Sequence, residues 1–330
     1  MTNRTIGDYP IDVVITWVDG DDELWQQKIT PYLEKKIDWS NKKDTLRFQS
    51  IDEISYSIRS IIKFAPFVRN IFLVTDNQKP ASFDELVVLA KHRDINLKLV
   101  DHKEIFKGYE HCLPTFNARS IGTMLFRIKG LADHFIYFAD DFFFMKEVKD
   151  SDFFINGQPI IRGQWAKFYE DRIFRKFYLK TLKLLGIKNR VVKAGSKKAQ
   201  QFGAKYNGLD SYVKLHHTPK GIRKSTIESI FNDNPSLLEH NIKYRLRSEH
   251  QFLISSLAYH REIKNGTCKI QKNLQLTYFQ SYKSFFMVKI KLWWFLFNKN
   301  KLFTCFQSLD IADEKTINYI KAWMNKRLSS

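Results

Sequence analysis

Cysteine is scarce in this sequence, and the few cysteines are spaced too widely to organise a fold. Only Cys112, Cys268 and Cys305 occur, with no CxxC pair among them. Neither a disulfide framework nor a structural zinc site is therefore supported. Unpaired cysteines are typical of a reducing compartment, so we expect a cytoplasmic protein.

Glycine and proline are also few, with 13 and 8 residues in a chain of 330. Their shortage excludes a fibrous protein and a chain dominated by disordered linkers. Hydrophobic residues make up 44% of the sequence and aromatic residues 15%. A chain of this length and composition can bury one large core or two moderate ones, so we expect a globular protein.

Long apolar runs are missing as well. Residues 1–10 lack the hydrophobic stretch of a secretory signal, and no run reaches the length of a transmembrane helix. The most apolar segment, residues 285–297 (FFMVKIKLWWFLF), carries Lys289 and Lys291 and is too short to span a bilayer. We interpret it as a buried helix or strand, with peripheral contact at a membrane surface as the alternative.

Acidic residues are outnumbered, because 54 Lys and Arg face 35 Asp and Glu, for a formal charge of +19. This surplus indicates polyanionic partners such as anionic lipid, phosphorylated glycan or nucleotide phosphates. Nucleic acid is not expected, because the sequence has no zinc-finger, RNP or helix-turn-helix signature. Basic residues crowd the stretch 162–206, which we expect to be a helical insertion with a solvated basic face or a surface for an anionic polymer.

Strand and helix patterns alternate over the first 140 residues. Runs rich in β-branched and aromatic residues predict strands over 11–18, 70–75, 97–100 and 135–138. Helices are predicted from about Glu23, over 52–65 before Pro66, and over 120–131. The pattern becomes helical again over 214–260, with a break at Asn234-Pro235. This alternation predicts an α/β fold with a Rossmann-like, mostly parallel sheet flanked by helices.

Acidic loops follow two of the predicted strands. Asp140 and Asp141 come directly after the fourth strand, and adjacent carboxylates at a strand end can hold Mg²⁺ or Mn²⁺ against a diphosphate. The loop after the first strand reads DGDD and includes Asp19 and Gly20, a glycine that permits close approach of a ligand. Each loop alone is also compatible with a solvated turn. Two acidic loops at neighbouring strand ends indicate a cation site.

The later half of the chain offers basic groups that suit phosphate chemistry. His217, in the segment HHTP, provides an imidazole for general base catalysis or phosphate binding, although a structural histidine is the simpler interpretation. Arg245, Arg247 and Glu249 lie at a predicted loop-to-helix entry, where a guanidinium suits bidentate contact with phosphate and a solvated face is equally compatible. Trp17 is either a core aromatic or a platform for a base.

Four blocks of sequence, in order, resemble the Stealth proteins. These are capsular polysaccharide phosphotransferases whose animal relative is the N-acetylglucosamine-1-phosphotransferase that marks lysosomal enzymes. The blocks are residues 11–22 (IDVVITWVDGDD), residues 47–78, residues 113–116 (LPTF) with 135–141 (FIYFADD), and residues 217–219 (HTP) with 247–252 (RSEHQF). With the segments inside 113–141 and 217–252 included, the four blocks span about a third of the chain.

The resemblance implies a glycosyltransferase-A-like core and a divalent cation, Mg²⁺ or Mn²⁺. It implies transfer of hexose-1-phosphate from a UDP-sugar donor to a hydroxyl of a glycan or capsular polysaccharide acceptor, with a phosphodiester formed and UMP released. Contact with the inner membrane or with other capsule-assembly proteins is expected to be peripheral. By motif position, the catalytic residues are Asp140, Asp141, His217 and Arg247, and Asp140 and Asp141 are also the metal ligands. The residues expected to bind substrate are Trp17, Asp19, Gly20, Arg47, Arg59, Asp76, Asn77, Arg245 and Glu249.

The chain departs from the family pattern at two positions. Ala139 precedes the aspartate pair where the family commonly has asparagine, so an amide contact is missing there. The family commonly reads RDNEEL where this chain has QSIDEI over residues 49–54, so the arginine of that pattern is missing here. Arg47 is the candidate to replace it. The expected organisation is an α/β core over 1–160, a basic helical insertion over 161–210, a return to the core over 211–265, and an aromatic and basic extension over 266–330.

Two other functions remain open from the sequence. A conventional metal-dependent glycosyltransferase would form a glycosidic bond and release a nucleoside diphosphate. A non-catalytic polyanion-binding protein would bind with a steep salt dependence and no metal requirement. In the phosphotransferase, the acceptor oxygen attacks the phosphorus nearest the sugar, so the anomeric configuration is kept. Either an aspartate of the pair or His217 would take the proton.

Overall fold

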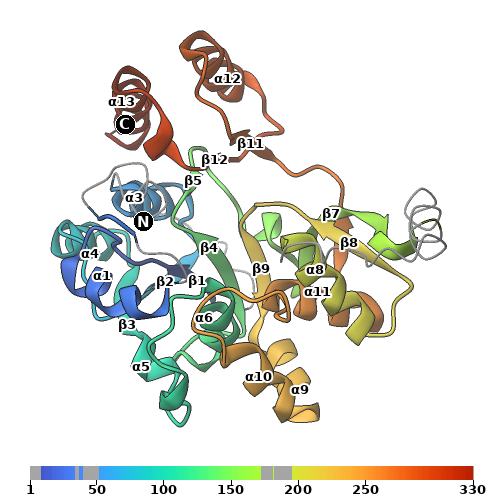
Figure 1. Cartoon of the computed structure of the whole chain (residues 1–330). Coiled ribbons are helices and arrows are strands. Elements are labelled where there is room, and N and C mark those ends of the chain that lie inside the picture. Colours follow the sequence, from blue (N-terminus) through green and yellow to red (C-terminus); the bar gives the residue numbers. More distant parts are fainter. Residues whose placement is uncertain (1–8, 34–36, 40–51, 172–180, 182–194, 330) are drawn as a thin grey trace.

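The computed structural model describes residues 9–33, 37–39, 52–171, 181 and 195–329 (Figure 1). Its centre is a five-stranded sheet in the order β3-β2-β1-β4-β9. The strands are β1 (Ile11–Thr16), β2 (Val68–Thr75), β3 (Asn96–Asp101), β4 (His134–Ala139) and β9 (Lys220–Arg223). The first four run parallel, and β9 pairs antiparallel with β4. The predicted α/β fold with a mostly parallel sheet is therefore confirmed.

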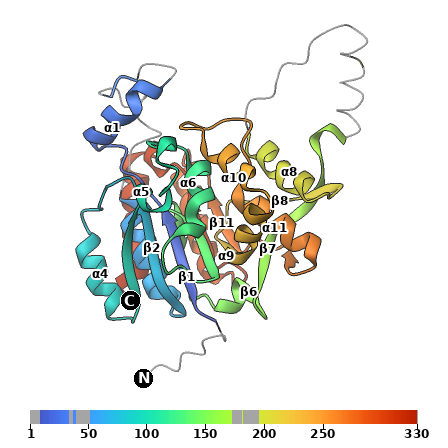
Figure 2. The same ribbon diagram turned by 90° about the horizontal axis from the view of Figure 1, so that it is seen from below.

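Helices cover both faces of this sheet, because successive side chains of a strand point to opposite faces. On β1, Val13 and Ile15 join the core under α3 (Glu53–Phe64) and α4 (Phe83–Lys91), whereas Val14 joins the core under α6 (Ala118–Met124). In Figure 2, α4 lies on one side of β1 and β2, and α8 (Ser196–Tyr206), α10 (Pro235–Ile242) and α11 (Ile254–Asn265) lie on the other. Short helices α1 (Glu23–Ile29) and α5 (His102–Ile105) follow β1 and β3.

The order of the strands creates a switch point between β1 and β4. From β1 the chain moves outward to β2 and β3, and it then returns to the other side of β1 to form β4. Ligands of open α/β sheets bind outside the carboxyl ends of strands at such a point, because the connections leave there in opposite directions. The loops that begin at Trp17 and Asp140 are the two that flank this point.

Two smaller sheets extend the core. One is built on β7 (Gln158–Lys167), which pairs with β6 (Phe154–Ile155), β8 (Ser211–Leu215) and β10 (Lys269–Gln271). The other has the order β11-β12-β5, formed by β11 (Leu276–Phe279), β12 (Phe303–Phe306) and β5 (Phe142–Phe144). Helices α12 (Phe285–Phe297) and α13 (Glu314–Ser329) contribute side chains to a small core with Phe143 and Phe306.

Several predicted elements differ from the structure. The helical pattern expected over 214–260 is wrong at its start, where the end of β8 and then β9 precede α9 (Lys224–Asp233), although the break at Asn234-Pro235 is confirmed. A helical insertion is also wrong for 161–167, which continue β7; α8 is helical, and 172–180 and 182–194 lie outside the described residues. The helix expected over 120–131 ends at Met124 and gives way to a 3₁₀ turn over Leu125–Arg127.

The apolar segment 285–297 forms a helix that is only partly buried. In α12, the buried residues are Val288, Leu292 and Phe295. Among the described residues, no helix is both long enough and apolar enough to cross a membrane.

Candidate active site

A cavity of about 600 Å³ opens at the switch point, outside the carboxyl ends of β1 and β4. Four parts of the chain, far apart in sequence, contribute predicted site residues to its wall. These are the loop after β1, the turn after β4, the loop between β8 and β9, and the loop between α10 and α11. The residues are Trp17, Gly20, Asp140, Asp141, His217 and Arg247.

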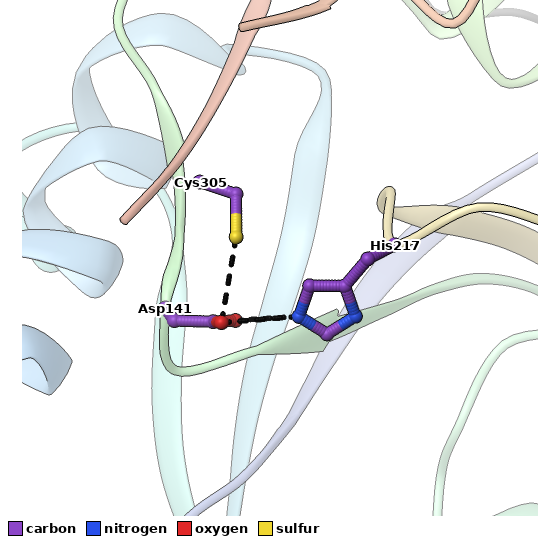
Figure 3. Close-up of side chains that lie close together, drawn as sticks. All are labelled: Asp141, His217 and Cys305. Carbon is purple, nitrogen blue, oxygen red and sulfur yellow. Dashed lines mark hydrogen bonds and ion pairs between the residues drawn. The ribbon is translucent and has the colours of Figure 1, made fainter. Parts of the chain in front are cut away.

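Asp141 joins two of these parts directly (Figure 3). Nε2 of His217 lies 3.0 Å from Oδ2 and 3.2 Å from Oδ1 of the Asp141 carboxylate. The thiol of Cys305, on β12, donates to Oδ2 at 3.4 Å. Both partners are distant in sequence, and both reach Asp141 because β9 pairs with β4 and β12 pairs with β5.

Cys305 is fully buried, and its thiol acts as a hydrogen-bond donor. Burial raises the pKa of this thiol far above its usual range, and the charge and hydrogen bond of Asp141 raise it further. Ligand atoms of Asp141, His217 and Cys305 lie within 4.8 Å of one another, a spacing that would suit a metal ion. Because metals bind the thiolate, a thiol held in its protonated form is a poor ligand. A metal ion at this group would therefore have to displace the thiol proton.

Asp140 lies beside Asp141 and is strongly affected by its surroundings. Burial raises the pKa of its carboxyl to about 7, and the charges of Asp141 and Glu53 act in the same direction. Asp310 also lines the cavity, and burial raises the pKa of its carboxyl. Four carboxyl groups thus face one cavity, an arrangement that a bound cation stabilises.

The loop that carries His217 is held by packing and by one lysine. The imidazole lies against the Phe142 ring, with a centroid separation of 4.4 Å. Lys220, the first residue of β9, donates to the Thr218 carbonyl at 3.0 Å. Burial lowers the pKa of Lys220 to about 8, and the charge of Asp141 opposes that change. A positive charge is therefore held close to the acidic pair.

The loop that carries Arg247 is tied to the amino end of α6. Asn117 donates to the Leu246 carbonyl at 2.9 Å and to Gln251 Oε1 at 2.8 Å. Arg119 donates to the Ser248 carbonyl at 2.8 Å. These bonds bracket Arg247, which is exposed at the cavity wall. The residues on either side of Arg247 therefore fix the backbone that positions its guanidinium group.

Six other predicted residues do not line the cavity, and several have structural roles. The Asp19 N–H donates to Gln78 Oε1 at 2.8 Å, and its carboxylate accepts from the Asp21 N–H at 3.0 Å, so Asp19 stabilises its own turn. Asp76 forms an ion pair with Lys28 at 2.8 Å. The six are Asp19, Arg59, Asp76, Asn77, Arg245 and Glu249, while Arg47 lies outside the described residues.

Arg245 and Glu249 lie in the same loop as Arg247 but do not line the cavity. Arg245 donates to the carbonyls of His111 and Leu113, each at 3.2 Å. Glu249 pairs with Lys198 at 2.9 Å, a contact that lowers the pKa of its carboxyl. Both side chains therefore stabilise the loop that carries Arg247.

Sequence reasoning missed several residues of the cavity wall. Glu53 and Asp310 add carboxylates, and His102 adds an imidazole whose pKa is lowered by burial. His102 directly follows β3, so the strand-end argument that found Asp140 would also have found it. No local pattern marks Cys305 or Lys220, because both reach the site through long-range strand pairing.

The fold and the cavity define an α/β protein with an acidic cavity at the switch point of its sheet. Comparison with known proteins identifies its family. Conserved regions 1 and 2 of the Stealth proteins match residues 9–37 and 47–160. A capsular polysaccharide phosphotransferase of Neisseria meningitidis serogroup B is 32% identical over 269 residues, which are 78% of this chain and 67% of that protein. The chain belongs to the Stealth family.

Other relatives carry similar names. A capsular polysaccharide phosphotransferase of Haemophilus influenzae is 34% identical over 75% of this chain and 63% of its own length. An exopolysaccharide phosphotransferase of Streptomyces coelicolor is 33% identical over 76% of this chain and 39% of its own length. The chain thus spans less than two thirds of these two relatives. A solved glycosyltransferase from Streptococcus pneumoniae aligns with 97% of this chain and 64% of its own, at 10% identity and a TM-score of 0.41.

Proposed function

We propose that this protein transfers hexose-1-phosphate from a UDP-sugar to a hydroxyl of a capsular or cell-surface polysaccharide, with a phosphodiester formed and UMP released. The observation that carries this proposal is the meeting of Asp141, His217 and Arg247 at one cavity at the switch point. The relatives named as phosphotransferases support it. A protein that only bound polyanions would gain nothing from a cavity lined by four carboxyl groups.

The oxygen donors fit a hard divalent cation, Mg²⁺ or Mn²⁺. Asp140 and Asp141 are adjacent, and the raised pKa of Asp140 shows the cost of placing its charge in a buried, acidic setting. We assign these two carboxylates as the ligands. When bound, the cation would neutralise charge on the diphosphate of the donor.

His217 is the group best placed to accept the proton of the acceptor hydroxyl. Its Nε2 faces the Asp141 carboxylate, which favours the tautomer with hydrogen on Nε2 and leaves Nδ1 as a proton acceptor. Asp141 would then orient the ring and stabilise the imidazolium. Arg247 would neutralise the phosphoryl oxygens, while Trp17 and Gly20 form the wall at the end of β1.

We also propose that the reaction takes place in the cytoplasm. Cys112, Cys268 and Cys305 are all free, which suits a reducing compartment.

Matched substitutions test this assignment. Asp141→Asn and His217→Gln should each lower hexose-1-phosphate transfer from a UDP-sugar panel to capsule oligosaccharides by about 100-fold or more. Asp84→Asn and His92→Gln are matched controls on exposed side chains and should retain transfer. Thermal unfolding should show that all four variants are folded. Wild-type transfer by both site variants would refute the assignment.

A further inference from the structure

Helix α12 presents one face to the protein and an apolar face to solvent. Its buried residues pack into the small core that includes Phe143 and Phe306. In Figure 1, α12 lies at the top of the view, far from α9 and α10. Six apolar side chains of the helix are between 40% and 69% exposed: Phe286, Met287, Ile290, Trp293, Trp294 and Phe297.

These exposed side chains form one continuous stripe. Successive residues of a helix are rotated by about 100°, so the six fall within an arc of about 120°. The buried residues Val288, Leu292 and Phe295 lie on the opposite side of the helix. Lys289 and Lys291 fall on either side of the stripe and are both exposed. The helix therefore has two apolar faces, one buried in the protein and one exposed, and lysines border the exposed one.

The surrounding sequence has only one sign of charge. Residues 263–309 contain eight lysines and no aspartate, glutamate or arginine. A second copy of this surface would place lysine against lysine, so self-association through the stripe is opposed by charge repulsion. An anionic lipid surface satisfies both features, because it accepts apolar side chains and attracts lysine. Trp293 and Trp294 also suit the headgroup region, where indole rings concentrate.

We propose that α12 docks on an anionic membrane surface and lies in its plane. A helix of 13 residues is about 20 Å long, whereas a bilayer core is about 30 Å thick, so α12 would rest on the membrane without crossing it. β11 and β12 flank α12 in the chain, and β12 carries Cys305 and pairs with β5 next to Asp141. Docking would therefore hold the cavity at a fixed orientation to the membrane.

Vesicle flotation of the full chain tests the proposal. Wild-type protein should float with vesicles that contain about one third phosphatidylglycerol and should bind pure phosphatidylcholine much more weakly. The triple variant Phe286→Gln/Trp293→Gln/Phe297→Gln should lose about tenfold or more of this binding, because it removes the apolar stripe without emptying the core. A matched control on exposed positions elsewhere, Leu24→Gln/Val88→Gln/Ile311→Gln, should bind like wild type.

A second variant keeps the test valid if the triple variant fails to fold. Lys289→Ser/Lys291→Ser should weaken binding to anionic vesicles and make it less sensitive to added salt, while Lys269→Ser, on β10 of a different sheet, should have a smaller effect. Failure of wild type to float, or equal flotation of wild type and both stripe variants, would overturn the proposal. A wild-type dimer that the triple variant converts to a monomer, without vesicle binding, would identify a protein interface instead.

Discussion

At the scale of single residues, His260 shows how a buried group links stability to pH. Its Nε2 accepts from the Val213 N–H at 3.0 Å, and its Nδ1 donates to the Ser256 carbonyl at 2.7 Å. Both ring nitrogens are therefore used by the neutral imidazole. Burial lowers the pKa of His260, and the same cause lowers the pKa of His102.

The contribution of these two histidines to stability should therefore fall as the pH drops below about 6.5, although the raised pKa of Asp140 acts in the opposite direction. The folded pKa of each histidine lies below its unfolded value, so the unfolded chain binds more protons in this range. Each such histidine contributes up to about 1.4 kcal/mol per pH unit to the slope of the free energy of unfolding against pH. Denaturant unfolding between pH 7 and 5 should give a smaller slope for His260→Gln than for wild type, while the exposed-site control His92→Gln keeps the wild-type slope. Identical slopes for wild type and His260→Gln would contradict this account.

Sequence could predict two kinds of residue at the cavity, those at strand ends and, by motif position, His217 and Arg247. Asp140 and Asp141 follow a clear strand, and the strand-end rule places them at the cavity. Asp19 and Asp76 satisfy the same rule, but their carboxylates bind the Asp21 N–H and Lys28 instead. The direction of a side chain after a strand depends on hydrogen bonds within the turn. The periodicity of hydrophobic residues in the sequence does not predict those bonds.

At the scale of elements, close packing of α8 on α11 requires a glycine. A Cβ at Gly203 would lie 2.8 Å from backbone atoms of Ser256 and Leu257, which cannot move without shifting α11. Gly203→Ala should therefore lower the free energy of unfolding by about 1–3 kcal/mol.

Gly122, on α6, is the matched control for this change. A Cβ there would meet the Tyr137 hydroxyl at 3.5 Å, an ordinary contact, and alanine favours a helix. Gly122→Ala should leave the free energy of unfolding unchanged or slightly raised. Chemical denaturation of both variants gives the comparison, and equal effects would show that the α8–α11 contact is not tight.

Elements with strong local patterns could be predicted from sequence, and elements made by distant pairing could not. The β1 to β4 strands are apolar runs bounded by turns, so their positions follow from local sequence. β8 and β9 are only five and four residues long, and their partners β7 and β4 lie elsewhere in the chain. A run that short does not separate strand from helix by its period. The buried face of α12 likewise depends on β5 and β12.

At the scale of the whole molecule, the acidic cavity should couple cation binding to stability. A cation that binds only the folded state raises the free energy of unfolding by about 2.7 kcal/mol when its concentration is 100 times its Kd. Millimolar Mg²⁺ or Mn²⁺ should therefore raise the Tm of wild type, and a chelator should reverse the rise. The double variant Asp140→Asn/Asp141→Asn should show no such rise, while Asp84→Asn should behave like wild type. An equal rise in wild type and the double variant would place the cation elsewhere.

The nucleotide released in the transfer reaction tests the central claim most directly, because attack on phosphorus and attack on the sugar leave different products. Purified protein, a UDP-sugar and a capsule oligosaccharide should yield UMP and a glycan whose ³¹P spectrum contains a phosphodiester signal. Release of UDP with a phosphate-free glycosidic product would contradict the account.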